Sequence, residues 1–141
     1  MKTPLDIRHW ESWFLEEFNY FDYELNLVVA EGISSPEPDE NAPVPGAHSM
    51  EVHPESRRYK IAFAHVLLFR VIDESYIKED SDATGTKGVL QKFEKSEFLS
   101  FAKENCNFWA HDSYSHYRLK TTNEFIDIIA TGAPEIKETS S

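Results

Sequence analysis

The segment from Arg57 to Ile77 constrains the fold most, because it is long, apolar over its middle and free of glycine and proline. It reads RRYKIAFAHVLLFRVIDESYI and is rich in the β-branched and aromatic residues that favour strands. Successive strand residues point to opposite faces, and here both faces are apolar, so both must be covered. We therefore predict one long, bent central strand. One of its faces would carry Tyr59, Ile61, Phe63, His65, Leu67, Phe69 and Val71.

The N-terminal part predicts a helix followed by a strand. Thr3 and Pro4 are typical of a helix start, and large apolar residues then recur at helical spacing up to Phe18. This pattern favours an amphipathic helix of about four turns. Residues 21–33 change to an alternating pattern, with Leu25 and Leu27 on the apolar side, which predicts a half-buried strand.

The C-terminal part predicts further short elements. Residues 89–93 suggest a short strand, Ser96 can cap a helix that runs to about residue 105, and residues 115–121 alternate as a strand. Thr121 and Glu124 have capping-box spacing ahead of an apolar stripe, which favours a final short helix, although residues 125–130 also suit a buried strand. The predicted fold class is α+β: a single domain over residues 1–141, with an antiparallel sheet, a long central strand, an N-terminal helix and one or two C-terminal helices.

Three polar segments are predicted to lie outside the core. Residues 34–57 hold five of the seven prolines and five acids, which indicates a long exposed loop. Residues 78–88 form a second loop rich in turn residues, and residues 136–141 a disordered tail.

The charge balance excludes two classes of partner. The chain has 25 acids against 14 bases and a net charge of −11, without any extended basic cluster. Nucleic acids and anionic membranes would be repelled, whereas a basic protein partner would be attracted. No apolar run is long enough to span a bilayer and no signal peptide is visible, so we expect a cytoplasmic protein. Cys106 is the only cysteine, which excludes an internal disulfide.

Acidic residues in the two loops are the candidate partner-binding residues. They would attract a cationic surface and speed encounter with it, although acidic loops also serve solubility alone. In the first loop they are Glu37, Asp39, Glu40, Glu51 and Glu55, and around the second they are Asp73, Glu74, Glu79, Asp80 and Asp82.

A second candidate site is a pocket of titratable side chains. Its members would have to converge in the folded chain, and they are His65, His116, Tyr117, Arg118 and Asp127. Asp127 is expected either on the outward face of the last helix or as the partner of His65 or Arg118. His111 and His116 are five residues apart, a spacing that suits neither a helical nor a strand metal site, so no metal and no cofactor is predicted. No catalytic residue is assigned, since the sequence lacks nucleophile and phosphate-loop motifs.

Three patches carry a resemblance to a known family. IRHWESW opens the chain, YKIAFAHVLLFRV lies in its middle and TTNEFIDIIA closes it. In order and character they are similar to small bacterial immunity proteins of contact-dependent and polymorphic toxin systems. The resemblance implies an acidic, single-domain, cytosolic protein that blocks a toxin domain by plugging or covering its site, without catalysis.

Three functions therefore stand as hypotheses. The first is an immunity-type binding protein that occludes a basic toxin domain through its acidic loops. The second is a small cone-shaped α+β enzyme or ligand-binding domain that uses His65, Tyr117 and Asp127. The third is a homo-oligomeric structural subunit, because Trp10, Trp13 and other large residues lie on neighbouring faces of the predicted first helix.

Overall fold

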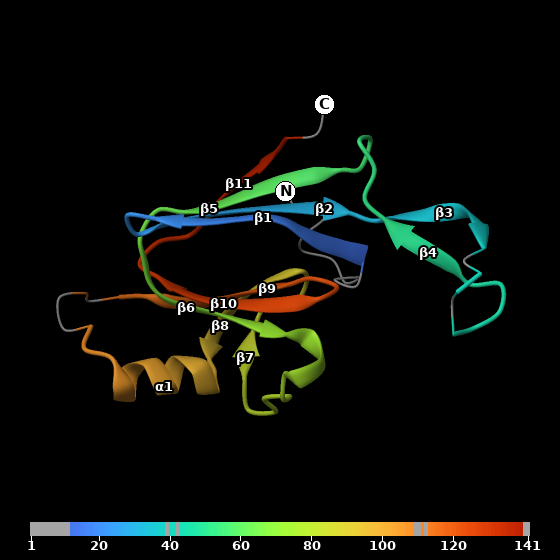
Figure 1. Ribbon diagram of the computed structural model, residues 1–141. Helices are drawn as coiled ribbons and strands as arrows, with labels where there is room; N and C mark the ends of the chain where they lie inside the picture. The colour runs from blue at the N-terminus through green and yellow to red at the C-terminus, as the bar shows by residue number, and fades with distance from the viewer. Residues whose placement is uncertain (1–11, 39, 42, 109–110, 112, 140–141) are drawn as a thin grey trace.

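The protein is a sandwich of two antiparallel sheets with one helix outside it (Figure 1). The computed structural model describes residues 12–38, 40–41, 43–108, 111 and 113–139. The four-stranded sheet has the order β1 (Trp13–Phe21), β2 (Glu24–Glu31), β5 (Arg58–Phe63) and β11 (Glu135–Glu138). The five-stranded sheet has the order β6 (Val66–Asp73), β10 (Glu124–Ala130), β9 (Ser115–Lys120), β8 (Leu90–Lys95) and β7 (Thr84–Gly85). The short 3-10 helix η3 (Glu74–Tyr76) follows β6.

The predicted α+β class is wrong, because the described part of the chain is 52% strand and only 11% helical. Its single α-helix is α1 (Glu97–Asn105), which Ser96 caps as predicted. None of the described helices has the length and apolar character needed to cross a membrane.

The core lies between the two sheets. Alternate residues of β2 point inward, as the sequence pattern predicts, and Leu25, Leu27 and Val29 are fully buried. From the opposite sheet, residues such as Leu119 and Ile126 meet them. Helix α1 covers the outer face of the five-stranded sheet through a smaller cluster of Phe98, Leu99, Ala102 and Ile129.

The long central strand is instead two strands in different sheets. β5 ends at Phe63, the chain crosses the sandwich at Ala64 and His65, and β6 begins at Val66. Both faces of this segment are apolar because its two halves are covered in different ways, and not because one central strand is covered on both sides. β5 is covered by the opposite sheet, while β6 contacts the core on one face and α1 on the other.

The N-terminal helix is wrong wherever the structure describes it, since Trp13–Phe21 form β1; the first part of the predicted helix lies outside the described residues. The reason is a β-bulge between Leu15 and Glu17. A bulge inserts one extra residue and shifts the alternation. The inward-facing residues Trp13, Leu15 and Phe18 are therefore two and three residues apart, and this hides the strict alternation that identifies a strand.

The predicted last helix is also wrong, and the alternative strand reading is correct, because residues 124–130 form β10. Thr121 and Glu124 make one of the two hydrogen bonds of a capping box, from the Glu124 N–H to the Thr121 hydroxyl, but in the turn between β9 and β10. The Thr121 hydroxyl donates to the Glu124 carbonyl at 2.7 Å and accepts from the Glu124 N–H at 3.2 Å. The same local chemistry therefore closes a hairpin in place of a helix start.

The first polar segment is exposed but not structureless. β3 (Ile33–Pro38) and β4 (His48–Glu51) pair only with each other and form an arm that projects from the end of the sandwich (Figure 1). The expected tail contains β11, in which Lys137 pairs with Lys60 of β5.

Candidate functional site

Asp127 is the centre of a buried polar cluster on the outer face of the five-stranded sheet. Its register partners are Arg70 in β6 and Arg118 in β9, so two guanidinium groups flank one carboxylate. Arg70 Nε donates to Oδ2 at 2.8 Å, and Arg118 donates to Oδ1 at 2.8 Å and to Oδ2 at 3.2 Å. His116 Nε2 lies 2.6 Å from Oδ1. The carboxylate is completely buried and fully hydrogen-bonded, as a buried charge must be.

Both ring nitrogens of His116 have hydrogen-bond partners. An ionised carboxylate only accepts, so Nε2 carries the proton that points at Asp127. Nδ1 lies 2.7 Å from the Ser96 hydroxyl. Ser96 Oγ in turn accepts the Leu99 N–H at 3.1 Å as the cap of α1. A continuous chain of hydrogen bonds thus links the helix cap to the centre of the sheet.

Charge explains why Asp127 stays ionised. Burial works to raise the pKa of its carboxyl, but hydrogen bonds from His116 and Arg118 and the charge of Arg118 outweigh it. The pKa of Asp127 therefore lies well below its usual range.

Aromatic rings enclose the polar cluster. Phe93 stacks on His116 with ring centroids 4.8 Å apart, and Phe98 contacts the same ring at 5.1 Å. The Arg70 guanidinium carbon lies 4.4 Å above the centre of the Phe98 ring. These contacts keep water from the imidazole and fix α1 against the sheet.

Ser96, His116 and Asp127 have the connectivity of a serine hydrolase triad, with the two ring nitrogens exchanged. A nucleophilic hydroxyl must reach a substrate. Ser96 is only 5% exposed, and its oxygen is held between His116 and the Leu99 N–H. The geometry therefore supports an anchor for α1 and not a nucleophile.

The structure brings together three of the five residues of the predicted pocket, namely His116, Arg118 and Asp127. Tyr117 points the other way, into the core against Phe63, where burial raises the pKa of its phenol. His65 is exposed at the crossover between the sheets, where it stacks on Tyr23 at 5.4 Å. His65, Tyr117 and Asp127 therefore do not face one cavity.

Sequence reasoning missed Arg70 and Ser96 as members of the cluster. Ser96 was recognisable as a helix cap, but nothing in the sequence links it to His116, twenty residues further along. For Arg70 the sequence did contain a clue, because this residue is a single cation within an apolar run. His116 lies within β9, whereas His111 precedes that strand. The ring centroid of His111 lies 5.3 Å from that of His65.

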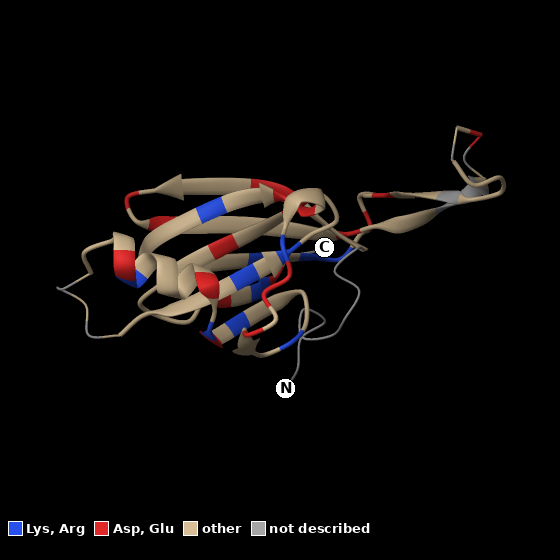
Figure 2. Cartoon of the chain, turned by 90° about the horizontal axis from the view of Figure 1, so that it is seen from below, with Lys and Arg blue, Asp and Glu red and all other residues tan. Residues whose placement is uncertain are grey.

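The predicted acidic residues fall on two separate parts of the molecule. Glu40, Glu51 and Glu55 are exposed on or beside the β3–β4 arm; Glu37 lies in β3, and Asp39 lies outside the described residues. Asp73 is the last residue of β6 and Glu74 the first of η3, while Glu79, Asp80 and Asp82 belong to the loop under the five-stranded sheet. Figure 2 shows the arm projecting away from the acidic loop, so the two sets do not form one continuous surface.

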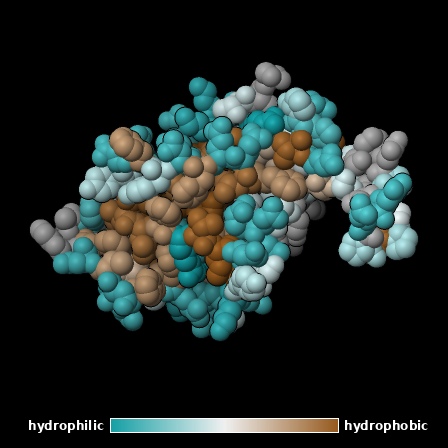
Figure 3. All heavy atoms as spheres, in the orientation of Figure 1, coloured by the Kyte–Doolittle hydropathy of each residue, from teal (hydrophilic) through white to brown (hydrophobic). Residues whose placement is uncertain are grey.

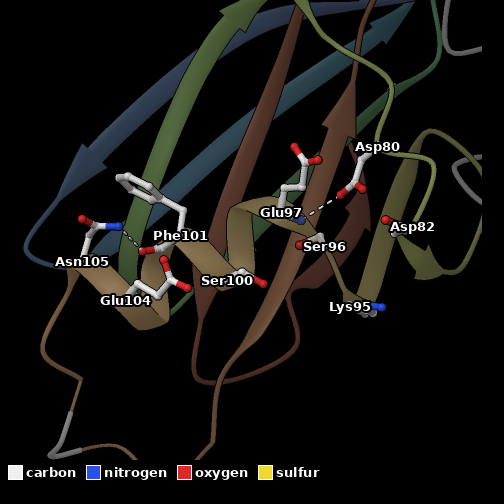
Figure 4. Close-up of a pocket in the computed structure, with 9 residues that line it drawn as sticks. All are labelled: Asp80, Asp82, Lys95, Ser96, Glu97, Ser100, Phe101, Glu104 and Asn105. Atoms are coloured by element: carbon white, nitrogen blue, oxygen red, sulfur yellow. Dashed lines mark hydrogen bonds between the residues drawn. The ribbon is translucent and has the colours of Figure 1, made fainter.

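Part of the second acidic set gathers at the start of α1 (Figure 4). The Asp80 carboxylate accepts the Glu97 N–H at 2.7 Å and so occupies the positive end of the helix. A depression of about 370 Å³ beside it is also lined by Asp82 and Glu104, with Lys95 as the only base. The described residues contain no group of three histidine, cysteine or acidic side chains that could hold a metal ion.

One edge of the sandwich, between β1 and β6, exposes apolar surface. β1 and β6 are edge strands, and their inward-facing residues Leu15, Phe18, Tyr20, Phe69 and Val71 form what we call the open side. Phe69 contacts Phe18 at 5.5 Å and Tyr20 at 4.9 Å between ring centroids. Phe18, Tyr20 and Val71 nevertheless remain 38%, 42% and 50% exposed. Figure 3 looks onto this side and shows a brown apolar band between two polar margins.

Comparison with protein-family models, curated proteins and solved structures found no match to this chain.

Proposed function

We propose that this protein is a cytoplasmic binding protein of the immunity type, which inhibits a basic protein domain by covering it. The open side is the observation that carries the proposal. A sandwich normally buries inward-facing aromatic residues, and contiguous exposed apolar surface marks sites of protein association.

Charge defines the kind of partner. The chain carries a net charge of −11, and exposed carboxylates border the open side, among them Glu17 of β1 and Asp73 at the end of β6. An apolar centre with a charged margin is the usual composition of a protein interface. A basic partner with an apolar contact residue complements both parts, and the acidic arm would add attraction at longer range.

The test is capture of a partner from host lysate by matched double variants. Phe18→Ser with Val71→Ser removes an aromatic and an aliphatic side chain from the open side. Phe101→Ser with Val44→Ser removes the same two residue types from exposed positions elsewhere. We expect the parent and the second variant to retain one basic protein at low salt, and the first variant to lose it.

High salt provides the second arm of the test. Screening should weaken capture by the parent, because the charged margin contributes to encounter and affinity. Equal retention by both double variants would refute the open side as the contact surface. The absence of any basic protein on the parent would refute the proposed function.

A further inference from the structure

A second site lies under the five-stranded sheet, away from the open side. The loop of residues 77–87 lies against the outer face of the five-stranded sheet (Figure 2). A cavity of about 700 Å³ is lined by this loop and by residues of β8, β9 and β10. We call it the lysine pocket. Its lining includes four cationic side chains, Lys78, Lys87, Arg118 and Lys120, and two carboxylates, Glu79 and Asp80.

The positive balance of the lysine pocket is unusual for a chain with a net charge of −11. One of its two carboxylates, Asp80, is already engaged by the backbone N–H of Glu97. Lys78 and Lys87 are exposed and make no ion pair with any residue that the structure describes. Lys78 and Lys87 therefore bring two positive charges to the pocket that no carboxylate of the described residues pairs with.

Arg118 is held rigidly at the wall of the pocket. Its Nε and Nη2 donate to Asp127, and its guanidinium carbon lies 5.6 Å from the centre of the Phe93 ring and 5.7 Å from that of Phe125. Its side chain is only 14% exposed. Nη1 makes no hydrogen bond to any of the described residues. An arginine fixed in this way is preorganised for an anion, since little side-chain entropy remains to be lost.

The polar cluster leaves this arginine only partly neutralised. Asp127 supplies one negative charge to two guanidinium groups. Arg70 can disperse its charge into water, because 45% of its side chain is exposed. Arg118 has little such access, and the lysine pocket is the cavity that it lines. Excess positive charge in a poorly hydrated position attracts a small anion.

The rim of the pocket is fixed at two points. Asp80 ties the start of the loop to α1, and Thr86 ties its end to β8 through the Gln91 side chain, which donates to the Thr86 carbonyl at 3.1 Å. The Lys92 N–H also donates to the Thr86 hydroxyl at 2.8 Å. The pocket is thus preformed and needs no large rearrangement to accept a ligand.

Apolar side chains complete the lining, among them Ile77, Phe93 and Phe125. They offer contact area to an organic group beside the charged one. We propose that the lysine pocket binds a phosphate dianion, either free or as the ester of a small organic molecule, through Lys78, Lys87 and Arg118. A polyanion such as a nucleic acid is disfavoured, because the acidic remainder of the surface repels it.

The test is an NMR titration of the isotope-labelled full chain at constant ionic strength. Inorganic phosphate and phenyl phosphate are the probes, and phenyl sulfonate is the singly charged comparison. We expect saturable shifts of the Thr86 and Lys87 amides and of the Arg118 Nε–H, with the sulfonate at least several-fold weaker than phenyl phosphate. Tighter binding of phenyl phosphate than of phosphate would identify an ester as the ligand, and equal binding would identify the free ion.

Matched lysine variants separate a site from a general charge effect. Lys78→Ala with Lys87→Ala should weaken phosphate binding about tenfold, since hydrogen bonds to charged groups are the strong ones. Lys60→Ala with Lys137→Ala removes two exposed lysines from the other sheet and should leave the affinity unchanged. Shifts that do not saturate, or equal losses in both double variants, would overturn the proposal. Neither variant touches the open side, so this test is independent of the proposed function.

Discussion

At the scale of single residues, Asp127 shows how one side chain can organise a sheet face. Three strands and the cap of α1 meet at its carboxylate, through Arg70, Arg118 and His116 with Ser96. The sequence left Asp127 either on the outward face of a last helix or as the partner of His65 or Arg118, and the structure pairs it with Arg118. The sequence could not indicate Arg70, since that pairing depends on strand order and not on local pattern.

Replacement of this carboxylate gives a pH-dependent prediction. Asp127→Asn should lower the free energy of unfolding at pH 7 by roughly 3–5 kcal/mol, because two arginines lose their buried counter-charge. The folded pKa of Asp127 lies below the unfolded value of about 3.9, so its ionised form stabilises the fold above that pH, and this contribution fades as the pH falls further. Urea unfolding should therefore show a deficit that is constant from pH 5 to 8 and shrinks below pH 4.

Asp82→Asn, at an exposed position, is the control for that series and should match the parent throughout. A parent-like Asp127→Asn variant at pH 7 would contradict the electrostatic account of the cluster.

At the scale of elements, α1 depends on its N-cap Ser96 as well as on its apolar face. Ser96 both caps the helix and bonds to His116, so Ser96→Ala should cost about 1–3 kcal/mol. Ser100→Ala, on an exposed position of the same helix, should stay within about 0.5 kcal/mol of the parent. Thermal unfolding with amide exchange of α1 would check both, and equal effects of the two substitutions would show that neither the cap nor the link to His116 stabilises the helix.

Some strands and the helix could be predicted from the sequence, and others could not. β2, β9 and α1 follow from local patterns, because alternation and a serine cap act within a few residues. β1 was mistaken for a helix because its bulge interrupts the strand alternation, and β10 because its hairpin turn contains one of the hydrogen bonds of a capping box. The crossover at His65 had no local signal, since the change of sheet is set by what packs on each side.

At the scale of the whole molecule, net charge and the open side have opposite effects on self-association. Apolar exposure favours association, whereas two copies with a charge of −11 each repel one another. We expect a monomer at low salt and growing association in about 1 M salt, where the Debye length falls to about 3 Å. Sedimentation velocity of the parent and the two serine double variants tests this expectation.

The variant with Phe18→Ser and Val71→Ser should stay monomeric in high salt, while the control with Phe101→Ser and Val44→Ser should associate like the parent. Association of all three proteins alike would place the contact elsewhere on the surface.

The strand order has a consequence for how the chain folds. β6 and β10 are neighbours although Arg70 and Asp127 are 57 residues apart, and β5 pairs with both an early and a late strand. Such distant pairing makes folding slow, on the order of milliseconds to seconds. Until the late strands arrive, β5 and β6 expose unpaired edges that can join those of another chain. The large negative charge then protects the folding intermediate, because half-folded chains repel one another before their edges can meet.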